Sequence, residues 1–283
     1  MARTVYVNGS YVSERNAVVH YEDRGYQFAD GVYEVILVRR GRLIDEIQHL
    51  DRLERSLREL SISMPMGRPP LEAVIHETLR RNFVQEGIIY LQVTRGVAPR
   101  DHTFPKAPIS SLVVAAKRRN WPASDSEPKG GLGVFVRDER WARCDVKSIS
   151  LLPNVLAKEK AKQLGAVEAN LVSDDGTVTE GGSSNVWIVD RKGALHTHPL
   201  GPEILGGVTR GVIKRLAEDA QISVVEEPFD RNALMNASEV FVTSATSFVK
   251  PILNIDGVQI GDGKVGPVTS RIFSLYNAHT LAG

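Results

Sequence analysis

A lysine in apolar surroundings, Lys147, is the first candidate for chemistry. It lies in the stretch RWARCDVKSISLLPN, residues 140–154. Its apolar neighbours in the sequence are Val146, Ile149, Leu151 and Leu152. A lysine amine becomes a nucleophile or base at neutral pH only when burial or a nearby positive charge lowers its pKa. The neighbours offer burial and Arg143 offers a charge, but a strand lysine whose amine reaches solvent has the same local pattern.

A carboxylate followed by a polar turn is the second candidate. Glu180 ends the stretch TVTE, and GGSSN follows before the apolar stretch VWIV. Such a carboxylate could bind the protonated ring nitrogen of a heterocyclic ligand, while the N–H groups and hydroxyls of the turn donate hydrogen bonds. A hairpin with a polar turn has the same sequence without binding any ligand.

Three stretches could bind a phosphate. Gly206–Gly207 precedes a helical pattern, so that backbone N–H groups could approach an anion, and Thr209 adds a hydroxyl. The stretch FVTSATS carries the hydroxyl residues Ser244 and Thr246. The helical stretch HLDRLERS contains Arg52, whose guanidinium can bind a phosphate through two hydrogen bonds. Each feature is also common in proteins that bind no phosphate.

Two pairs of charged or polar residues alternate along the chain. Arg100 and His102 lie in TRGVAPRDHTF, and in an extended loop both could face one anionic group, such as a substrate carboxylate. Charge on a proline-containing surface loop is the alternative reading. His196 and His198 alternate as two metal ligands would, but no third ligand lies near them in the sequence. We therefore expect a polar strand end there, and no metal.

Taken in order, these motifs resemble the fold-type IV pyridoxal-phosphate (PLP) enzymes, which include D-amino acid aminotransferases, branched-chain aminotransferases and aminodeoxychorismate lyases. The resemblance rests on CDVKS around Lys147, NVLAK after it, TVTEGGSSNV around Glu180, and the arginine motif HLDRL. Within that group, EDRGYQFADGVYEV and YLQVTRGVAPRDHTFP look most like D-amino acid aminotransferase, whose signature is an Arg-x-His carboxylate trap. The match extends from Tyr21 to Gly266.

The resemblance implies PLP as the cofactor. Lys147 would form a Schiff base with it and later move the substrate proton. Glu180 would keep the pyridine nitrogen protonated, so that the ring can take up electrons released at the substrate α-carbon. Arg52 and the helix start after Gly207 would hold the phosphate, and Leu205 would pack against the ring. The other residues expected at the cofactor are Val208, Thr209, Ser244, Ala245, Thr246, Ser184 and Asn185.

The implied substrates are D-amino acids and 2-oxo acids, between which an amino group moves in two half-reactions. Tyr33, Arg100 and His102 would bind the substrate α-carboxylate, with Ser183 also at the substrate. In the family, the arginine and histidine come from the partner subunit, so that a homodimer is implied.

Three positions depart from the family pattern. Ala245 replaces a usual hydroxyl residue, Phe248 stands where a glutamate is common, and Gly182 stands where a serine is common. These departures bear on substrate preference and PLP affinity. The alternatives on the same scaffold are a branched-chain aminotransferase, an (R)-amine transaminase and an aminodeoxychorismate lyase. Outside it, the alternatives are a cofactor-free Schiff-base lyase and a non-catalytic ligand-binding protein.

The bulk composition limits the classes of function. The 283 residues are 42% hydrophobic and 24% charged, which is typical of a globular chain long enough for two domains. A formal net charge of +1 favours neither nucleic acid nor a membrane surface as a partner. The single cysteine, Cys144, excludes an internal disulfide, and we expect it to be a packed core residue. No apolar run has the length of a signal peptide or a membrane span, so the expected location is the cytoplasm.

The elements that must position these residues follow from turn signals and hydrophobic periods. Hairpins are expected over 4–12, around Asn8–Gly9, and over 31–44, around Arg40–Gly41. An amphipathic helix is expected over 46–60, with its apolar face formed by Ile47, Leu50, Leu53, Leu57 and Leu60. Further helices are expected from Pro69 to about Phe83, over 154–165 and 208–220, and from Pro267. Further strands are expected over 87–96, 109–118, 132–141, 222–226 and 239–245, and within 166–198 with a hairpin turn at Asp175–Gly176.

These elements predict an α+β fold with two domains. Residues 1–118 would form a small N-terminal α/β sandwich, and residues 119–131, rich in Pro, Ser, Asp and Gly, a linker. Residues 132–283 would form a larger cofactor-binding domain with a β-barrel-like core flanked by helices.

Overall fold

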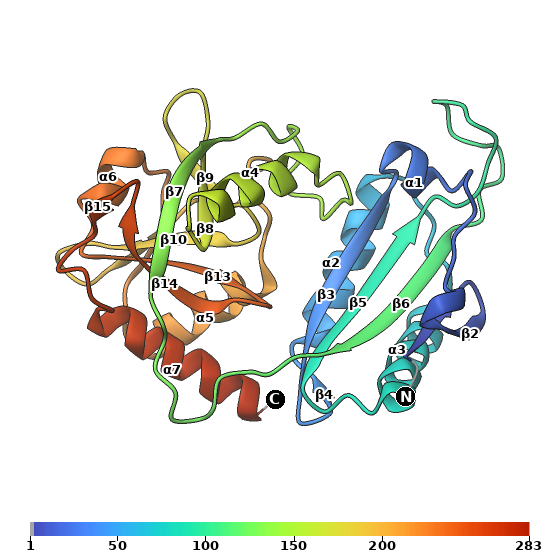
Figure 1. Ribbon diagram of the computed structural model, residues 1–283, viewed down its shortest axis with the longest axis horizontal. Helices are drawn as coiled ribbons and strands as arrows, with labels where there is room; N and C mark the ends of the chain where they lie inside the picture. The colour runs from blue at the N-terminus through green and yellow to red at the C-terminus, as the bar shows by residue number, and fades with distance from the viewer. Residues whose placement is uncertain (1–2, 283) are drawn as a thin grey trace. The chain divides into compact units, whose positions relative to one another are not determined.

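The computed structural model describes residues 3–282 (Figure 1). They separate into two compact units. The first contains the described residues up to Trp121 together with Val146–Ser150, and the second contains Pro122–Asp145 and Leu151–Ala282. Each unit combines helices with a sheet, which confirms the predicted α+β class. The five residues around Lys147 thus belong to the first unit, and the linker at 119–131 stays a prediction.

The described residues of the first unit form a six-stranded antiparallel sheet in the order β2-β1-β6-β5-β3-β4. The strands are β1 (Thr4–Val7), β2 (Ser10–Ser13), β3 (Gly31–Arg39), β4 (Arg42–Leu43), β5 (Gly87–Thr94) and β6 (Ser111–Arg118). Both hairpins in this unit are confirmed. Asn8 and Gly9 have φ values of 44° and 95°, and Arg40 and Gly41 have values of 51° and 74°. These are the left-handed conformations that two-residue hairpin turns need.

Two long helices, α2 (Glu46–Glu59) and α3 (Arg68–Asn82), pack on this sheet through one hydrophobic core. Figure 1 shows α2 running along β3. The apolar face predicted for α2 is largely confirmed, but Ile47, in its first turn, is 67% exposed. The short helices η1 (Glu14–Asn16) and α1 (Arg24–Phe28) were not predicted. Each has five residues or fewer, which is too short for a helical period to be recognised in the sequence.

The described residues of the second unit form a nine-stranded mixed sheet in the order β12-β11-β10-β13-β14-β7-β8-β9, with β15 paired to β14. The strands are β7 (Gly131–Arg137), β8 (Glu168–Val172), β9 (Val178–Gly181), β10 (Asn185–Val189), β11 (Leu195–Thr197), β12 (Val224–Glu226), β13 (Glu239–Ser244), β14 (Phe248–Ile255) and β15 (Val258–Gln259). The hairpin turn between β8 and β9 is confirmed, with Gly176 at φ 92°. Strand β14 was not predicted; it contains Pro251, which lacks the N–H that a central strand uses.

The second unit has a curled sheet flanked by helices. Strand β9 is the last strand in this order, but a short turn after Gly181 connects it in sequence to β10, which is third in the order. Within this turn, Gly181 N donates to Ser184 O at 2.7 Å. The helices are α4 (Leu152–Gln163), α5 (Val208–Asp219), α6 (Arg231–Met235) and α7 (Pro267–Ala282). Figure 1 shows α4, α5 and α7 lying against the strands of this unit. In residues 3–282, no helix has both the length and the apolar character needed to cross a membrane.

Candidate active site

The segment that carries Lys147 is not a strand, although a strand lysine was one reading of its sequence. It is irregular, and an isolated antiparallel bridge between Ser148 and Val32 joins it to β3. Strand β4 pairs only with Val38 and Arg39, at the far end of β3. The segment runs beside the other end of β3, where Ile149 N donates to Gly31 O at 3.1 Å.

The backbone of Lys147 is fixed from two elements. Its carbonyl accepts from Tyr33 N of β3 at 3.1 Å, and its N–H donates to Ser56 Oγ of α2 at 3.3 Å. The Lys147 Nζ atom lies 4.2 Å from the centroid of the Tyr33 ring, which is a cation–π distance. The structure thus brings together two of the predicted site residues, Lys147 and Tyr33. Burial and the neighbouring Tyr33 raise the pKa of Tyr90 to about 12, so that this phenol beside Tyr33 is neutral at physiological pH.

Arg52 lies on α2 and is paired with a buried carboxylate on β3. Its Nε and Nη2 donate to Glu34 Oε1 and Oε2 at 2.7 and 2.8 Å. His49 Nδ1 lies 2.8 Å from Glu34 Oε2. Burial raises the pKa of Glu34, but the charge and hydrogen bonds of Arg52 and His49 outweigh burial and hold it well below its usual range. Burial lowers the pKa of His49. The two bonds to Glu34 therefore hold the Arg52 guanidinium in one orientation.

Arg100 and His102 are exposed and share one aromatic neighbour. The Arg100 guanidinium carbon lies 4.6 Å from the centroid of the Phe28 ring, and the His102 ring lies 5.3 Å from it. Their loop is anchored between them, because buried Arg24 donates through Nη1 to Asp101 O at 2.6 Å. Arg100 and His102, which are two positions apart in the chain, therefore both lie against the Phe28 ring.

A buried ion cluster supports the same loop. Asp30 accepts from Arg24 Nε at 2.7 Å and from Arg95 Nε and Nη2 at 2.8 and 3.0 Å. The Arg95 guanidinium carbon in turn lies 3.6 Å from the centroid of the Phe104 ring, two residues after His102. Both arginines are 3% exposed. The sequence did not identify this cluster, because nothing local distinguishes a buried arginine from a solvated one.

In the second unit, Glu180 is buried and both of its carboxylate oxygens accept hydrogen bonds. Its Oε1 accepts from Asn185 Nδ2 at 2.9 Å and from Leu205 N at 2.8 Å, and its Oε2 is paired with Arg140 Nη1. Three predicted site residues, Glu180, Asn185 and Leu205, therefore lie together. Arg140 was not predicted, although it is the first residue of the stretch that drew attention to Lys147.

The turn after Glu180 rests on another buried carboxylate, Glu168. Its Oε1 accepts from Gly182 N and Lys158 Nζ, both at 3.1 Å, and its Oε2 accepts from Ser184 Oγ at 2.7 Å. The Ser184 hydroxyl thus faces Glu168, whereas Ser183 is exposed. A Cβ atom at Gly182 would lie 2.7 Å from the Lys158 side chain, which explains why glycine stands there.

Thr209, at the predicted phosphate-binding start of α5, and Phe248 of β14 both contact Tyr276 of α7. Helix α5 begins at Val208 after Gly207, where a Cβ atom would lie only 2.1 Å from Asn185 Oδ1. The Thr209 Oγ1 atom lies 3.4 Å from Tyr276 Oη, and the Phe248 ring lies 5.3 Å from the Tyr276 ring. The start of α5 and the start of β14 therefore contact one tyrosine.

The loop between β13 and β14 contains the other predicted phosphate ligands. Ser244 Oγ accepts from Ser247 N at 3.1 Å and lies 3.4 Å from Thr246 Oγ1. Ala245 contributes only backbone groups to this loop. Phe248, which departs from the family pattern, has a left-handed φ of 57° and is buried against Tyr276.

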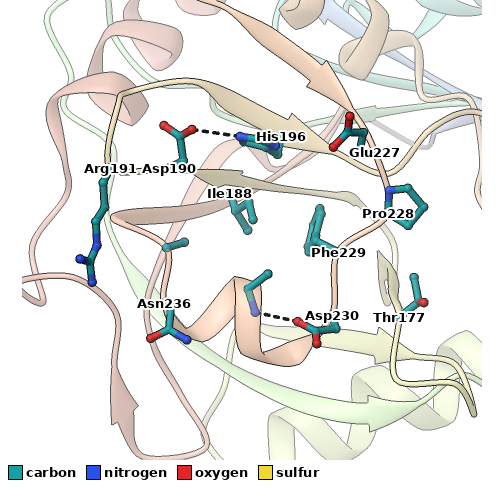
Figure 2. Close-up of a pocket in the computed structure, with 12 residues that line it drawn as sticks. Thr177, Ile188, Asp190, Arg191, His196, Glu227, Pro228, Phe229, Asp230 and Asn236 are labelled. Atoms are coloured by element: carbon teal, nitrogen blue, oxygen red, sulfur yellow. Dashed lines mark hydrogen bonds and ion pairs between the residues drawn. The ribbon is translucent and has the colours of Figure 1, made fainter.

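The second unit also contains a pocket of about 740 Å³ that lies away from the predicted ligands (Figure 2). It is lined by Thr177, Ile188, Asp190, Arg191, His196, Glu227, Pro228, Phe229, Asp230, Ala233, Asn236 and Ala237. None of them is a predicted cofactor or substrate ligand. Two of its charged groups have partners in the fold: Asp190 Oδ2 lies 3.2 Å from His196 Nε2, and Asp230 accepts from Ala233 N at 2.7 Å. Across residues 3–282, no group of three or more His, Cys, Asp and Glu side chains could hold a metal ion.

Comparison with known proteins gives consistent matches over the whole length of this chain. The family model described as "Amino-transferase class IV" matches residues 31–255. The chain is 45% identical over 276 residues to a D-alanine aminotransferase of Staphylococcus haemolyticus, covering 97% of each chain. It is 40% identical over 274 residues to a D-alanine aminotransferase of Listeria monocytogenes, covering 96% of this chain and 94% of that one.

A solved structure is also similar. The branched-chain aminotransferase of the thermophilic archaeon Thermoproteus uzoniensis, determined with norvaline, matches with a TM-score of 0.86 at 26% identity. The match covers 100% of this chain and 96% of that one. Sequence family, full-length relatives and fold agree: this protein belongs to the class IV aminotransferase family.

Proposed function

We propose that this protein is a D-amino acid aminotransferase that uses PLP to move the amino group of a D-amino acid to a 2-oxo acid. The identity of 45% to a D-alanine aminotransferase over nearly the whole chain supports the substrate class. The structural observation that carries the proposal is the placement of Arg100 and His102 on the one Phe28 ring. That arrangement offers two donors to a single carboxylate.

The donor groups of the chain fit each part of PLP. Lys147 offers an amine for the aldehyde, and Glu180 offers a buried carboxylate for the ring nitrogen. Arg52 offers a guanidinium for the phosphate, and the start of α5 offers backbone N–H groups after Gly207, where a side chain would collide with Asn185. Bound PLP would supply a ring that takes up the electrons released at the substrate α-carbon.

Each residue then has a defined task. Lys147 Nζ would hold the aldehyde end and, once released, would take the proton from the substrate α-carbon and deliver it to the former aldehyde carbon of the cofactor. Glu180 would hold a proton on the ring nitrogen. Arg100 and His102 would orient the substrate carboxylate, which decides the face of the α-carbon that meets the amine.

A homodimer is part of the proposal. Exposed apolar side chains lie in the chain segments beside the loop of Arg100 and His102: Tyr21, Tyr26, Val97, Phe104 and Ile109 are 47–85% exposed. They come from neighbouring stretches, since Asp23 forms a bridge with Val97, and a Cβ atom at Gly96 would lie 1.9 Å from Ile109 O. We call these five residues the apolar loop surface. An apolar surface of this kind beside ligand-binding residues favours a second copy of the chain as its partner.

The dimer can be tested by light scattering. We expect two chains per particle for the unmodified protein and one for the variant Tyr26→Asp/Ile109→Asp. Phe83→Asp, which changes a residue 63% exposed outside the apolar loop surface, is the matched control and should stay a dimer. A single chain per particle for the unmodified protein would contradict the proposed dimer.

The activity is tested with one panel of amino donors. D-alanine, other D-amino acids, L-leucine, L-valine and an (R)-amine are each supplied with 2-oxoglutarate or pyruvate in the presence of PLP. The proposal predicts the highest kcat/KM for D-amino acids. A preference for branched L-amino acids would favour the second candidate, a branched-chain aminotransferase, which the TM-score of 0.86 supports. Protein that binds no PLP would favour a ligand-binding protein or a cofactor-free lyase.

A further inference from the structure

The second unit buries an arginine between two carboxylates. Arg140 lies three residues after the end of β7, and its side chain is 6% exposed. Its Nε and Nη2 donate to Asp138 Oδ1 and Oδ2 at 2.9 and 2.7 Å, and its Nη1 donates to Glu180 Oε2. Burial alone would lower the pKa of Arg140, but the two carboxylates raise it well above its usual range. The arginine is therefore charged at every physiological pH.

Asp138 is tied to the strand that carries Glu180. Its Oδ2 accepts from the hydroxyl of Thr179 at 2.6 Å, and Thr179 immediately precedes Glu180 on β9. Its Oδ1 also accepts from the backbone N of Arg140 at 3.1 Å. Burial raises the pKa of Asp138, but the hydrogen bonds and charge of Arg140 outweigh burial and lower it. Asp138 is thus ionised at neutral pH.

The same cluster holds the loop before α5. Arg140 Nη2 donates to Glu203 O at 3.0 Å, and Glu180 Oε1 accepts from Leu205 N at 2.8 Å. Two residues of this loop therefore depend on the positions of Arg140 and Glu180. Cys144 also lies beside the cluster; burial raises its pKa to about 11, so that it adds no charge at neutral pH.

The formal charges of the cluster add to one negative charge. Asp138 and Glu180 contribute −1 each and Arg140 contributes +1. Without the charge of Asp138, Arg140 and Glu180 would form a neutral pair. Charges in a protein interior are weakly screened, so one buried charge changes the proton affinity of a nearby group strongly.

From this geometry we propose that Asp138 sets the charge that Glu180 presents to the ring nitrogen of bound PLP. Arg140 aims Glu180 and keeps it ionised. Asp138 cancels the positive charge of Arg140, which would otherwise favour loss of the proton from the ring nitrogen. Asp138 and Arg140 are positioning residues that act through Glu180. The inference rests on the proposed role of Glu180 as the partner of that nitrogen.

The test uses PLP labelled with ¹⁵N at its ring nitrogen, bound to the full-length protein. The ¹⁵N chemical shift separates a protonated ring nitrogen from an unprotonated one without any turnover. We expect a protonated shift for the unmodified protein and a shift toward the unprotonated form for Asp138→Asn. If the pKa of the nitrogen falls below the solution pH, each unit of decrease lowers its protonated fraction about tenfold. The rate of the first half-reaction with D-alanine should fall in parallel.

A double variant separates charge from structural support. Asp138→Asn/Arg140→Met leaves only Glu180 charged, so the formal charge returns to −1. The proposal predicts that this variant again shows the ¹⁵N shift of a protonated ring nitrogen, although it loses more hydrogen bonds than Asp138→Asn does. If Asp138 had only a structural role, the ¹⁵N shift of the double variant would differ from that of the unmodified protein more than the shift of Asp138→Asn does. If Asp138→Asn does not fold, the double variant decides alone: an unprotonated shift in it overturns the proposal.

The control variant is Asp174→Asn. Asp174 also pairs with an arginine through two bonds, Arg137 of β7, at 2.8 and 3.0 Å, but its side chain is 76% exposed. We expect no change in its ¹⁵N shift. If the unmodified protein binds no PLP, the proposed function fails. If it binds PLP with a protonated ring nitrogen and Asp138→Asn leaves the shift unchanged, the function stands and this inference is overturned.

Discussion

Arg52 of α2 and Glu34 of β3 form an ion pair with two parallel hydrogen bonds, at 2.7 and 2.8 Å, and Glu34 has no solvent exposure. Breaking a buried pair from one side leaves the remaining charge without compensation. We expect Glu34→Gln to lower the free energy of unfolding by about 3 kcal/mol, measured by urea denaturation. Glu77→Gln, at a partly exposed carboxylate paired with Arg80 and Arg81, is the control and should change it little. Equal effects of the two substitutions would contradict the assignment of Glu34.

The same pair gives stability a pH dependence of definite sign. Burial raises the pKa of Glu34, but Arg52 and His49 outweigh it and hold the pKa far below its usual range. A carboxyl group whose pKa is lower in the folded state contributes stability above its unfolded pKa, about 4.3, and loses that contribution as the pH falls. Between about pH 4 and pH 2, the unmodified protein should therefore lose more stability than Glu34→Gln. Parallel curves for the two proteins would refute this.

Arg24 connects the buried cluster to the loop of Arg100 and His102 through Asp101 O. Arg24→Met removes that bond but leaves Asp30 paired with Arg95. We expect the loop to hold Arg100 and His102 less well, which should raise the KM for D-alanine about tenfold while kcat stays within about threefold. Steady-state kinetics measure both values. Arg3→Met, at an exposed ion pair with Glu14, is the control; a fall in kcat with an unchanged KM would contradict the proposed role.

Gly207 and Gly211 offer a matched pair of substitutions around the start of α5. A Cβ atom at Gly207 would lie 2.1 Å from Asn185 Oδ1, whereas one at Gly211 would meet nothing within 4 Å. Asn185 also donates to Glu180. We expect Gly207→Ala to weaken PLP binding at least about tenfold, and Gly211→Ala to keep the affinity and stabilise the helix by about 0.5 kcal/mol. A titration of the apoprotein with PLP checks this, and equal dissociation constants for both variants would contradict it.

Cys144 should be chemically quiet. Burial raises its pKa to about 11, and the side chain is 8% exposed. The thiolate is the reactive form of cysteine, and a free cysteine has a pKa of about 8.5. Alkylation by iodoacetamide at pH 8 should therefore be at least about 100-fold slower than that of a free cysteine. Mass spectrometry over time measures the rate. Rapid modification of the folded protein would show that the thiol is neither buried nor protonated.

The sequence predicted the turns and helices that depend on local patterns of residues. The turns at Asn8–Gly9 and Arg40–Gly41 need left-handed backbone at those positions, and the structure has it there. The leucines of α2 repeat at helical spacing and are buried. These features depend on residues only a few positions apart, so that sequence alone reveals them.

What the sequence did not predict depends on partners distant in the chain. Lys147 is fixed by Tyr33 and Ser56, which lie about a hundred residues before it, so its irregular segment could be mistaken for a strand. A buried arginine such as Arg140 has the same local sequence as a solvated one until Glu180, 40 residues on, is seen beside it. The candidate site residues came mainly from the family resemblance, and the positioning carboxylates Glu34 and Asp138 came only from the structure.

We infer that Lys147 is the amine that holds PLP. The most direct measurement is to reduce the PLP-loaded protein with sodium borohydride, digest it and locate the fixed cofactor by mass spectrometry. We expect the cofactor to be attached to the peptide containing Lys147. We expect Lys147→Ala to carry none and to lose transamination of D-alanine while remaining folded. Attachment to a different lysine, or undiminished turnover by Lys147→Ala, would contradict it.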